Sequence, residues 1–396
     1  MKILLFWQYY PPEELGRALA ARGVAFAKSL RRTGHEVSVI APVRSGIPPA
    51  PSESRETILR DITYESLRQW LPPALAILVF PIVLLLLALR VKKLRPDVII
   101  ASQPSYTLPI QALLIARATG VKFAMDIQDV YLQDEVFARG SPWRMPKLML
   151  ERFVVNHVDF AFVVLPKMRD ELVRRHGMAH QRTMILYNGF DSDRFPAPAE
   201  KSRRTGIELI HAGSPRAYYD TLRLIEAFER ICTRRPLTRL AFTDCRENSY
   251  VTSTRSKASQ LGLNKNVEFR GQLRHDELLE LMSEARVGVY SLYPEESSRV
   301  LVGTKVFEYF AMGLPVAYLG FPGGSVDDLL RETDAGIIAH DAASFADGLV
   351  GLLEDPTKLE SLSRNARRAA QRYDWNKTIP PAMEALFRAC GLVTAE

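Results

Sequence analysis

Short apolar runs alternate with amphipathic segments along the first half of the chain. Five runs have the length and composition of buried strands: Ile3–Phe6, Glu36–Ala41, Val98–Ala101, Lys122–Ile127 and Phe160–Leu165. Three segments between them repeat apolar residues at helical spacing: Arg17–Thr33, Leu108–Thr119 and Met145–Val158. This alternation predicts an α/β domain with a parallel sheet and helices on its faces.

The second half repeats this rhythm. Its predicted strands are Glu208–His211, Leu240–Thr243, Val267–Arg270, Val287–Tyr290 and Val316–Leu319, with helices between them. At 396 residues the chain is too long for one ordinary domain, so the pattern predicts two Rossmann-like domains.

The boundary between the halves is marked by a change in composition. Ser192–Thr205 contains Pro196, Pro198 and mixed charges, without apolar periodicity. The last segment, Thr378–Leu392, has helical periodicity, and we expect it to pack on the first domain. We therefore predict a first domain over residues 1–190, a linker over 191–206, a second domain over 207–375 and a returning helix over 376–396.

One apolar stretch, Trp70–Leu89, carries no charge and is long enough to cross a bilayer, which takes about 20 residues. Strands predicted before and after it belong to one sheet, and a full span would separate them. Prolines also interrupt its helical hydrogen bonding: Pro72, Pro73 and Pro81. We expect a membrane-associating segment over residues 70–95 that lies in the inner leaflet; a helix buried in the core is the alternative.

Charge and composition limit the chemical classes of binding partner that we expect. Hydrophobic residues make up 47% of the chain and charged residues 24%, which indicates folded domains. The net charge of +7 favours phosphates or anionic lipid, and the basic cluster after the apolar stretch suits an anionic inner leaflet. Basic pairs such as Arg31-Arg32 lack interleaved aromatics, so we expect no nucleic acid.

The termini and cysteines favour a cytoplasmic protein. Three cysteines, Cys232, Cys245 and Cys390, lie far apart without metal-ligand or redox spacing, which is typical of a reducing compartment. The first apolar run reaches Pro11 without a cleavage signal, and we interpret it as the first strand.

The most informative segment runs from Gly303 to Val316. It predicts a glycine loop, a helix that begins at Thr304 and a stop at Gly313. The N–H groups at such a helix start bind a diphosphate, and Lys305 adds a cation. Glu308 lies on the same helical face, where its carboxylate can accept hydrogen bonds from ribose hydroxyls. An ordinary amphipathic helix with a solvated Lys–Glu pair is the alternative.

This segment resembles the donor-binding motif of glycosyltransferase family 4, which has the GT-B fold. The family often has two glutamates separated by seven residues; Glu308 matches the second, and Val300 stands at the first. Bacterial surface-polysaccharide members similarly read Pro/Ser-x-Lys-Leu-Phe-Glu-Tyr. The resemblance implies that Gly303, Thr304, Lys305 and Glu308 bind a nucleotide-sugar donor.

Other fragments match the family in the same order along nearly the whole chain. Tyr10-Pro11-Pro12-Glu13 with Gly16 resembles the loop over the substrate cleft, and Gly34-His35-Glu36-Val37 resembles the entry to the second strand. The family's interdomain Asn-Gly-x-Asp signature resembles residues 188–191, Asn-Gly-Phe-Asp. Gly271 resembles the family glycine that lies near the nucleotide base. The implied fold is GT-B: two facing Rossmann-like domains with parallel sheets and a C-terminal helix that crosses back.

The loop after the first strand of the second domain is expected to contact the leaving diphosphate. Gly213 fits the family glycine, whereas Ser214 stands where arginine is common. Tyr218-Tyr219-Asp220 stands near the usual Lys-Gly. Arg216 is our candidate for the missing charge, because a guanidinium suits phosphate; an ordinary surface arginine is the alternative.

The segment Asp126-Ile127-Gln128-Asp129 ends a predicted strand of the first domain. Strand alternation places Asp126 and Gln128 on one side and Asp129 on the other. Many family members carry His where Gln128 stands. By resemblance, Asp129 contacts an acceptor hydroxyl or the donor sugar, and Gln128, Glu13 and Gly16 line the acceptor side; a capping or structural role for Asp129 is the alternative.

No metal or cofactor is expected. Asp191-Ser192-Asp193 superficially resembles a DxD metal site, but turn formation in the Asn-Gly-x-Asp loop explains it better.

The resemblance implies a retaining, metal-independent hexosyltransferase on the cytoplasmic face of the cell membrane. It would move a sugar from a nucleotide sugar to a polyprenyl-linked acceptor in cell-surface polysaccharide biosynthesis. One alternative is a nucleotide-sugar epimerase, which needs an acid–base pair that is not evident beyond Asp126 and Asp129. Another is a catalytically inactive membrane-bound scaffold, favoured by Val300 and Ser214. The sequence does not predict the donor base, the sugar, the acceptor or the oligomeric state.

Overall fold

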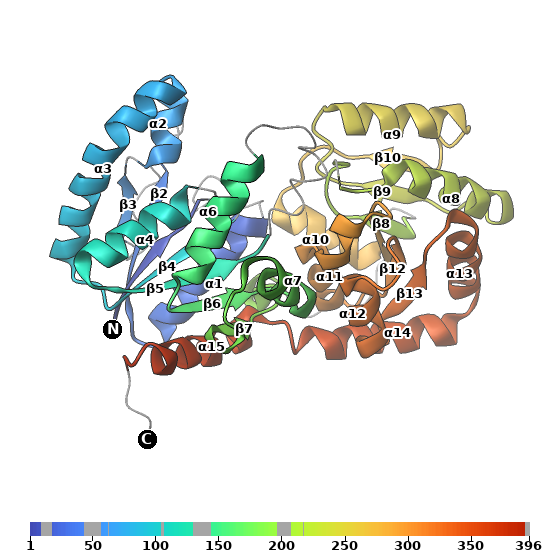
Figure 1. Ribbon diagram of the computed structural model, residues 1–396. Helices are drawn as coiled ribbons and strands as arrows, with labels where there is room; N and C mark the ends of the chain where they lie inside the picture. Colours follow the sequence, from blue (N-terminus) through green and yellow to red (C-terminus); the bar gives the residue numbers. More distant parts are fainter. Residues whose placement is uncertain are drawn as a thin grey trace. The chain divides into compact units, whose positions relative to one another are not determined.

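The computed structural model describes residues 1–8, 18–42, 57–61, 63–103, 107–129, 144–195, 207–216 and 218–392. The chain divides into two compact units. Unit 1 comprises Met1–Tyr187 and Trp375–Glu396, and unit 2 comprises Asn188–Asp374. Each unit is a sheet with helices on both faces, so the predicted pair of Rossmann-like domains is confirmed (Figure 1).

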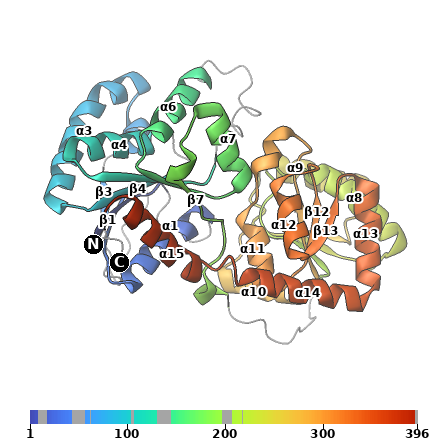
Figure 2. The ribbon, with the colours of Figure 1, turned by 60° about the horizontal axis from the view of Figure 1, so that its bottom comes forward.

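Unit 1 contains a seven-stranded parallel sheet in the order β3-β2-β1-β4-β5-β6-β7. The strands are β1 Lys2–Phe6, β2 Glu36–Pro42, β3 Thr57–Asp61, β4 Val98–Gln103, β5 Lys122–Ile127, β6 Phe160–Val163 and β7 Thr183–Ile185. The helices are α1 Ala18–Arg32, α2 Tyr64–Trp70, α3 Pro73–Leu94, α4 Leu108–Thr119, α6 Arg144–Asn156, α7 Pro166–His176 and α15 Trp375–Ala389, with a 3-10 turn over His180–Arg182. Figure 2 shows α1 and α15 on one face of this sheet and α3, α4 and α6 on the other.

The C-terminal helix returns to the first unit, as predicted. α15 packs beside α1, and its apolar face joins a core that includes Phe26 and the sheet residue Phe162. Ile379 and Leu386 are fully buried in this core. The helix begins at Trp375, before the predicted start, because Trp375 itself is part of the core.

Unit 2 contains a six-stranded parallel sheet in the order β10-β9-β8-β11-β12-β13. The strands are β8 Leu209–His211, β9 Leu240–Phe242, β10 Val267–Phe269, β11 Val287–Ser291, β12 Val316–Leu319 and β13 Gly336–Ala339. The helices are α8 Thr221–Arg234, α9 Ser249–Gln260, α10 His275–Glu284, α11 Thr304–Ala311, α12 Ser325–Thr333, α13 Ala342–Glu354 and α14 Pro356–Ala370. Two 3-10 turns cover Ser192–Arg194 and Glu296–Val300.

The boundary between the units lies a few residues before the predicted position. Phe190 pairs with Asp374 and packs against Phe195, which in turn packs against His275. These contacts assign residues 188–195 to unit 2, although the sequence suggested the end of the first domain and the start of the linker. The rest of the predicted linker, 196–206, lies outside the described residues.

The apolar helix α3 is not a core helix, which corrects the alternative left open by the sequence. Within it, the buried residues are Ala76, Leu87 and Val91. Large apolar side chains point to solvent, with exposed fractions of 73% for Leu78 and 61% for Ile82. The helix starts with Pro73 in its first turn and continues through Pro81. α3 is therefore an apolar helix on the surface of unit 1.

Candidate functional site

The start of α11 lies at the carboxyl edge of the unit 2 sheet, where α/β proteins bind ligands. Gly303 precedes the helix, and its N–H donates to the Tyr290 hydroxyl at 2.9 Å. A Cβ at Gly303 would stand 3.0 Å from that hydroxyl oxygen, so a larger residue would displace the tyrosine. Thr304 opens the helix, so the N–H groups of Thr304 and Lys305 precede the first hydrogen-bonded turn, which begins with the Val306 N–H donating to Gly303 O at 3.1 Å.

Lys305 is a buried cation at this helix start. Its side chain is 7% exposed, and Nζ has no hydrogen-bond partner among the described residues. Nζ lies 3.9 Å from the ring centre of Tyr219 and 5.9 Å from that of Tyr290. The pKa of Lys305 is lowered to about 7; burial is the main cause, Glu308 opposes the shift and nearby Arg216 adds to it. The aromatic faces attract the ammonium, but they give it no counter-charge.

Glu308 lies one helical turn after Lys305 and is partly buried. Desolvation raises the pKa of its carboxyl group, whereas the charges of Lys305 and Arg194 lower it. The structure thus brings together the cation and the carboxylate that the sequence predicted on one helical face.

The loop after β8 lies beside Lys305 at the start of α11. Gly213 adopts a φ of +111°, and its N–H donates to Thr243 Oγ1 at 2.8 Å. The positive φ favours glycine here, and a Cβ would lie 3.2 Å from Lys305 Nζ, so a larger residue would also shift the ammonium. Ser214 is buried, and its hydroxyl accepts a hydrogen bond from Asn248 at 3.4 Å. Ser214 therefore serves the local structure of the loop.

Arg216 lies at the rim of this cluster. Its side chain is 55% exposed, and its Nη2 lies 3.8 Å from Asp244 Oδ2. Asp244 has a φ of +52°, and its N–H donates to the carbonyl oxygen of Gly271. These contacts place Gly271 beside the carboxylate that holds Arg216. The predicted residues of unit 2 therefore gather at one edge of the sheet.

Several site residues escaped the sequence analysis because they look like core aromatics. The Tyr309 hydroxyl accepts from Ala212 N at 2.7 Å and donates to Ile210 O, which fixes the end of β8. His211 is fully buried, and its ring packs against Tyr219. Its pKa is held well below the ordinary value by burial and then by Lys305. Tyr309 lies on the buried face of α11 and His211 in a buried strand, so nothing in their local sequence separates them from core residues.

The residues predicted in unit 1 lie at the end of β5. Gln128 Nε2 donates to Asp126 Oδ2 at 2.7 Å, so these two side chains lie on one side of the strand as predicted. Asp126 also forms a buried ion pair with Arg22, with 2.7 Å between Oδ1 and Nη2. Asp129 is partly exposed at the end of a described segment. Glu13 and Gly16 lie outside the described residues.

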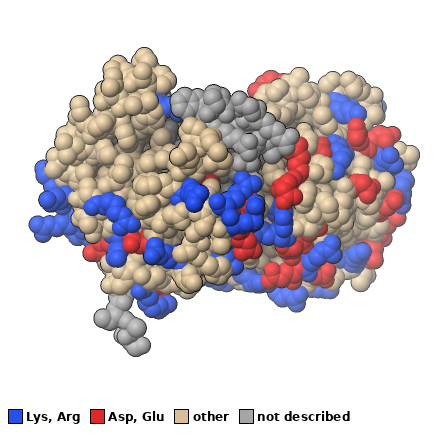
Figure 3. All heavy atoms as spheres, in the orientation of Figure 1, with Lys and Arg blue, Asp and Glu red and all other residues tan. Residues whose placement is uncertain are grey.

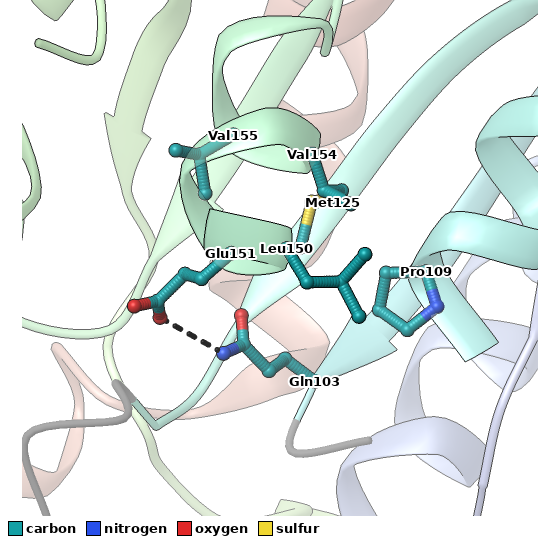
Figure 4. Close-up of a pocket in the computed structure, with 7 residues that line it drawn as sticks. All are labelled: Gln103, Pro109, Met125, Leu150, Glu151, Val154 and Val155. Carbon is teal, nitrogen blue, oxygen red and sulfur yellow. Dashed lines mark hydrogen bonds between the residues drawn. The ribbon is translucent and has the colours of Figure 1, made fainter. Parts of the chain in front are cut away.

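A second polar cluster, unforeseen in the sequence, lies at the end of β4. Gln103 Nε2 donates to Glu151 Oε1 at 3.3 Å, and the other carboxylate oxygen lies 2.8 Å from His176 Nε2. Gln103 and Glu151 line a small pocket with Met125 and other apolar side chains (Figure 4). Glu151 and His176 lie on different helices, so no helical spacing pairs them in the sequence.

Among the described residues, no three or more His, Cys, Asp or Glu side chains are grouped as a metal site requires. In Asp191-Ser192-Asp193, the Asp191 carboxylate accepts from the N–H of Asp193 at 3.1 Å. That segment is a turn, as predicted.

The two α/β units and the returning C-terminal helix define a protein of the GT-B class. Residues 17–189 match the family model of the glycosyl transferase 4-like domain, and residues 207–355 match that of glycosyl transferases group 1. The chain belongs to glycosyltransferase family 4. Since both models describe glycosyltransferases, the epimerase alternative has no support from the family.

Relatives extend over the full length. A glycogen synthase from Mycobacterium tuberculosis is 24% identical over 98% of this chain and 95% of its own length. Among solved structures, HepE from Anabaena in complex with UDP and glucose has a TM-score of 0.73 and 18% identity, covering 98% of this chain and 100% of HepE. Sucrose-phosphate synthase from Thermosynechococcus elongatus has a TM-score of 0.73 and 17% identity, covering 99% and 100%. At such identities, the structural likeness shows the fold.

Proposed function

We propose that this glycosyltransferase moves a sugar from a nucleotide-diphosphate sugar to a lipid-linked acceptor in cell-surface polysaccharide biosynthesis. The transfer retains the anomeric configuration, needs no metal and takes place at the cytoplasmic face of a membrane. The observation that carries the proposal is Lys305, a buried cation at the start of a helix whose Nζ has no hydrogen-bond partner among the described residues.

A diphosphate would supply the negative charge and the hydrogen-bond acceptors that Lys305 does not find among the described residues. It would pair with Lys305 and accept from the N–H groups of Thr304 and Lys305, which have no carbonyl of a preceding helical turn to donate to. Arg216 at the rim adds a forked donor, and Glu308 accepts from the ribose hydroxyls. The structural neighbour HepE is known in complex with UDP-glucose, which supports a nucleotide sugar as donor.

The proposed glycosyl transfer breaks one bond of the anomeric carbon and forms another. The bond between the anomeric carbon and the β-phosphate oxygen breaks, and the acceptor hydroxyl oxygen bonds to the same face of that carbon. The hydroxyl proton passes to the departing phosphate. Lys305, Arg216 and the helix start stabilise the charge that grows on the phosphate, as preorganised donors do. Asp129 is the proposed contact to a reacting hydroxyl.

The surface of α3 supports the membrane part of the proposal. Figure 3 shows the α2–α3 region largely without charged side chains on the visible face, with Lys and Arg at its lower end. Exposed basic residues follow the apolar face: Arg90, Lys92, Lys93 and Arg95. The strands before and after this segment, β3 and β4, belong to one parallel sheet, so the helix leaves and returns on one side of a bilayer. An apolar helix with basic residues at one end suits the interface of an anionic membrane.

The donor site is tested by thermal stabilisation with UDP-, GDP-, TDP- and CMP-sugars. One nucleotide class should raise the melting temperature of wild type, because it binds the folded state. Glu308→Ala should lose that shift, whereas Glu360→Ala, an exposed glutamate on α14, should keep it. Equal shifts in both variants would refute the placement of the donor site. Turnover of the stabilising donor then separates an enzyme from an inactive scaffold.

The membrane surface is tested by co-sedimentation with phosphatidylcholine vesicles, with and without phosphatidylglycerol. The Ile82→Ser/Leu86→Ser variant should lose binding, and Lys92→Gln/Lys93→Gln should lose the preference for anionic vesicles. Leu237→Ser, at a leucine of unit 2 that is more exposed than either α3 residue, is the control and should bind like wild type. Unchanged binding of the α3 variants would exclude α3 as the contact.

A further inference from the structure

Three neighbouring helices of unit 1, α3, α4 and α6, cover one face of its sheet. α4 packs against both of the others, and Figure 1 and Figure 2 show it between them. Each helix ends just before a parallel strand begins: α3 before β4, α4 before β5 and α6 before β6. Their C-terminal ends therefore lie together at the amino edge of the sheet. There Arg117 of α4 donates to the carbonyl oxygen of His157, directly after α6, at 2.6 Å.

The outer side of α6 carries an apolar stripe. Met145, Met149 and Phe153 recur every four residues, which places them on one face of the helix, and we call them the α6 stripe. Their exposed fractions are 66%, 69% and 43%. The opposite face packs into the unit, where Val154 is buried. Leu114 of the neighbouring α4 is also exposed. A single exposed apolar side chain is ordinary, but a row of them marks a surface that binds another one.

The exposed charges of these three helices have one sign. Their sequences contain no Asp and a single Glu, Glu151. Glu151 is 5% exposed and is held inside the unit by Gln103 and His176. The whole chain has 45 Asp and Glu against 52 Lys and Arg, so this face differs from the average surface. Its exposed charged residues, all toward the C-terminal ends of the helices, are Arg90, Lys92, Lys93, Arg117 and Arg152.

These features favour an anionic lipid bilayer as the occupant over a second copy of the chain. In a two-fold dimer the same patch meets itself, so its cations would find no exposed carboxylate on the partner's three helices. An anionic bilayer offers apolar chains to the α6 stripe and phosphate groups to the basic residues. The charge of the face therefore complements a membrane and opposes self-association.

We infer that α6 is a second membrane contact of unit 1, in which the α6 stripe enters the surface of an anionic bilayer and Arg117 and Arg152 bind lipid phosphates. The inference rests on the membrane part of the proposed function and extends it. A single helix on a bilayer leaves the protein free to rotate about that helix, whereas contacts through α3 and α6 fix which face of unit 1 lies on the lipid. Met145, in the first turn of α6, lies toward the carboxyl edge of the sheet, so this orientation keeps that edge near the lipid phase.

Co-sedimentation with vesicles tests the stripe while α3 stays intact. Met145→Ser/Met149→Ser should bind vesicles of phosphatidylcholine and phosphatidylglycerol about tenfold more weakly than wild type, because two apolar side chains no longer enter the lipid. Both methionines are largely exposed, so the melting temperature should not change. Leu222→Ser/Leu237→Ser, at two exposed leucines of unit 2, is the matched control and should bind like wild type. Wild-type binding by the methionine variant would overturn the inference.

The charge contribution is tested separately. Arg152→Gln should bind the anionic vesicles about fivefold more weakly and pure phosphatidylcholine vesicles like wild type, since one cation is lost from the lipid surface. Equal effects on both kinds of vesicle would contradict a phosphate contact at Arg152.

A fluorescent label reports the contact directly. Cys245 and Cys390 are buried, so in a Cys232→Ser background a thiol placed on the surface can be labelled selectively. Doxyl-labelled phosphatidylcholine in the vesicles should quench a dye attached at Met149→Cys and leave a dye at Leu222→Cys unquenched. An unquenched dye at Met149→Cys, or equal quenching at the two positions, would refute the α6 contact.

Two further measurements distinguish failure of this inference from failure of the proposed function. Ile82→Ser/Leu86→Ser in the same vesicle assay reports on α3 alone, so a loss seen only in that variant refutes α6 and retains α3. The nucleotide-induced thermal shift should persist in Met145→Ser/Met149→Ser, because the donor site lies in unit 2. Without vesicles, sedimentation equilibrium should give this variant and wild type the same mass. A wild-type dimer that the variant abolishes would make the stripe a self-association surface and overturn the inference.

Discussion

Arg22 in unit 1 and Lys305 in unit 2 are both buried cations, but their surroundings are opposite. Arg22 makes four hydrogen bonds and pairs with Asp126. Lys305 Nζ makes none to the described residues and lies against aromatic rings. Burying a charge is costly unless it is paired and hydrogen-bonded. Arg22 meets that condition within the fold, whereas Lys305 meets it only when an anion arrives.

The contrast suggests how to separate structural from functional charges in this protein. A buried cation whose counter-charge and hydrogen bonds come from the fold, like Arg22, stabilises the folded state. Removing its partner should destabilise the protein strongly. A buried cation without such partners, like Lys305, destabilises the folded state. It also favours binding of an anionic ligand, because the ligand offsets the free-energy cost of burying the charge. Substitutions at Arg22, Lys305 and Gly213, together with the pH dependence of donor binding, distinguish the two kinds of charge.

Replacing Arg22 should have the largest effect on stability. Arg22→Met leaves the buried Asp126 side chain without its ion-pair partner, which costs about 3–5 kcal/mol of unfolding free energy. Urea unfolding measures this loss. The double variant Arg22→Met/Asp126→Leu should be less destabilised than Arg22→Met alone, because no unpaired charge remains. A double variant as unstable as the sum of the single changes would contradict the paired-charge account.

Replacing Lys305 should affect function and spare stability. Lys305→Met is expected to lower turnover of the donor about 100- to 1,000-fold, as loss of a preorganised charge contact does. Its unfolding free energy should equal or exceed that of wild type, because an unpaired buried charge is removed. Lys265→Met, at an exposed lysine, is the control. A destabilised but active Lys305→Met would make Lys305 a structural residue like Arg22.

Gly213→Ala tests the space beside Lys305. The new Cβ would lie 3.2 Å from Nζ, in a backbone conformation with φ of +111°. We expect a loss of about tenfold in nucleotide affinity from the displaced ammonium, together with about 1–3 kcal/mol of strain. Gly262→Ala, where φ is +72° and no atom lies within 4 Å, should show strain and unchanged affinity. Equal affinity losses would attribute the effect to backbone strain alone.

The pKa of Lys305 predicts the pH dependence. Because the free site has a pKa of about 7 and a diphosphate raises it, donor affinity should fall up to about tenfold per pH unit above 7. Lys305→Met should remove this dependence, which isothermal titration across pH measures. Between pH 7 and the ordinary lysine value of 10.5, the unfolded chain binds more protons, so the contribution of Lys305 to stability improves as pH rises.

The sequence predicted the buried part of the fold well. Helix α4 and strands β5 and β12 have the predicted bounds, because each is a mostly apolar segment between clear boundaries. Strands β3, β7 and β13 were missed, and all three lie at sheet edges. An edge strand is covered on fewer sides, and its sequence therefore carries a weaker apolar signal.

Only those parts of the candidate site were predicted whose residues lie close together in the sequence. Lys305 and Glu308 follow from one helical turn, and Gly213 follows from its place after β8. The partners that give these residues their properties come from distant segments, as Tyr219 does for Lys305 and Arg22 does for Asp126. Contacts across 86 or 104 positions leave no periodic trace in a single sequence.

The most direct test is the proton balance of donor binding at pH 8. Titration calorimetry of the stabilising nucleotide sugar, in buffers of different ionisation enthalpy, gives the number of protons taken up. The account predicts that wild type takes up close to one proton per donor and that Lys305→Met takes up none, since Lys305 is largely neutral before binding and charged afterwards. Proton uptake that is equal in the two proteins would show that Lys305 does not meet the diphosphate.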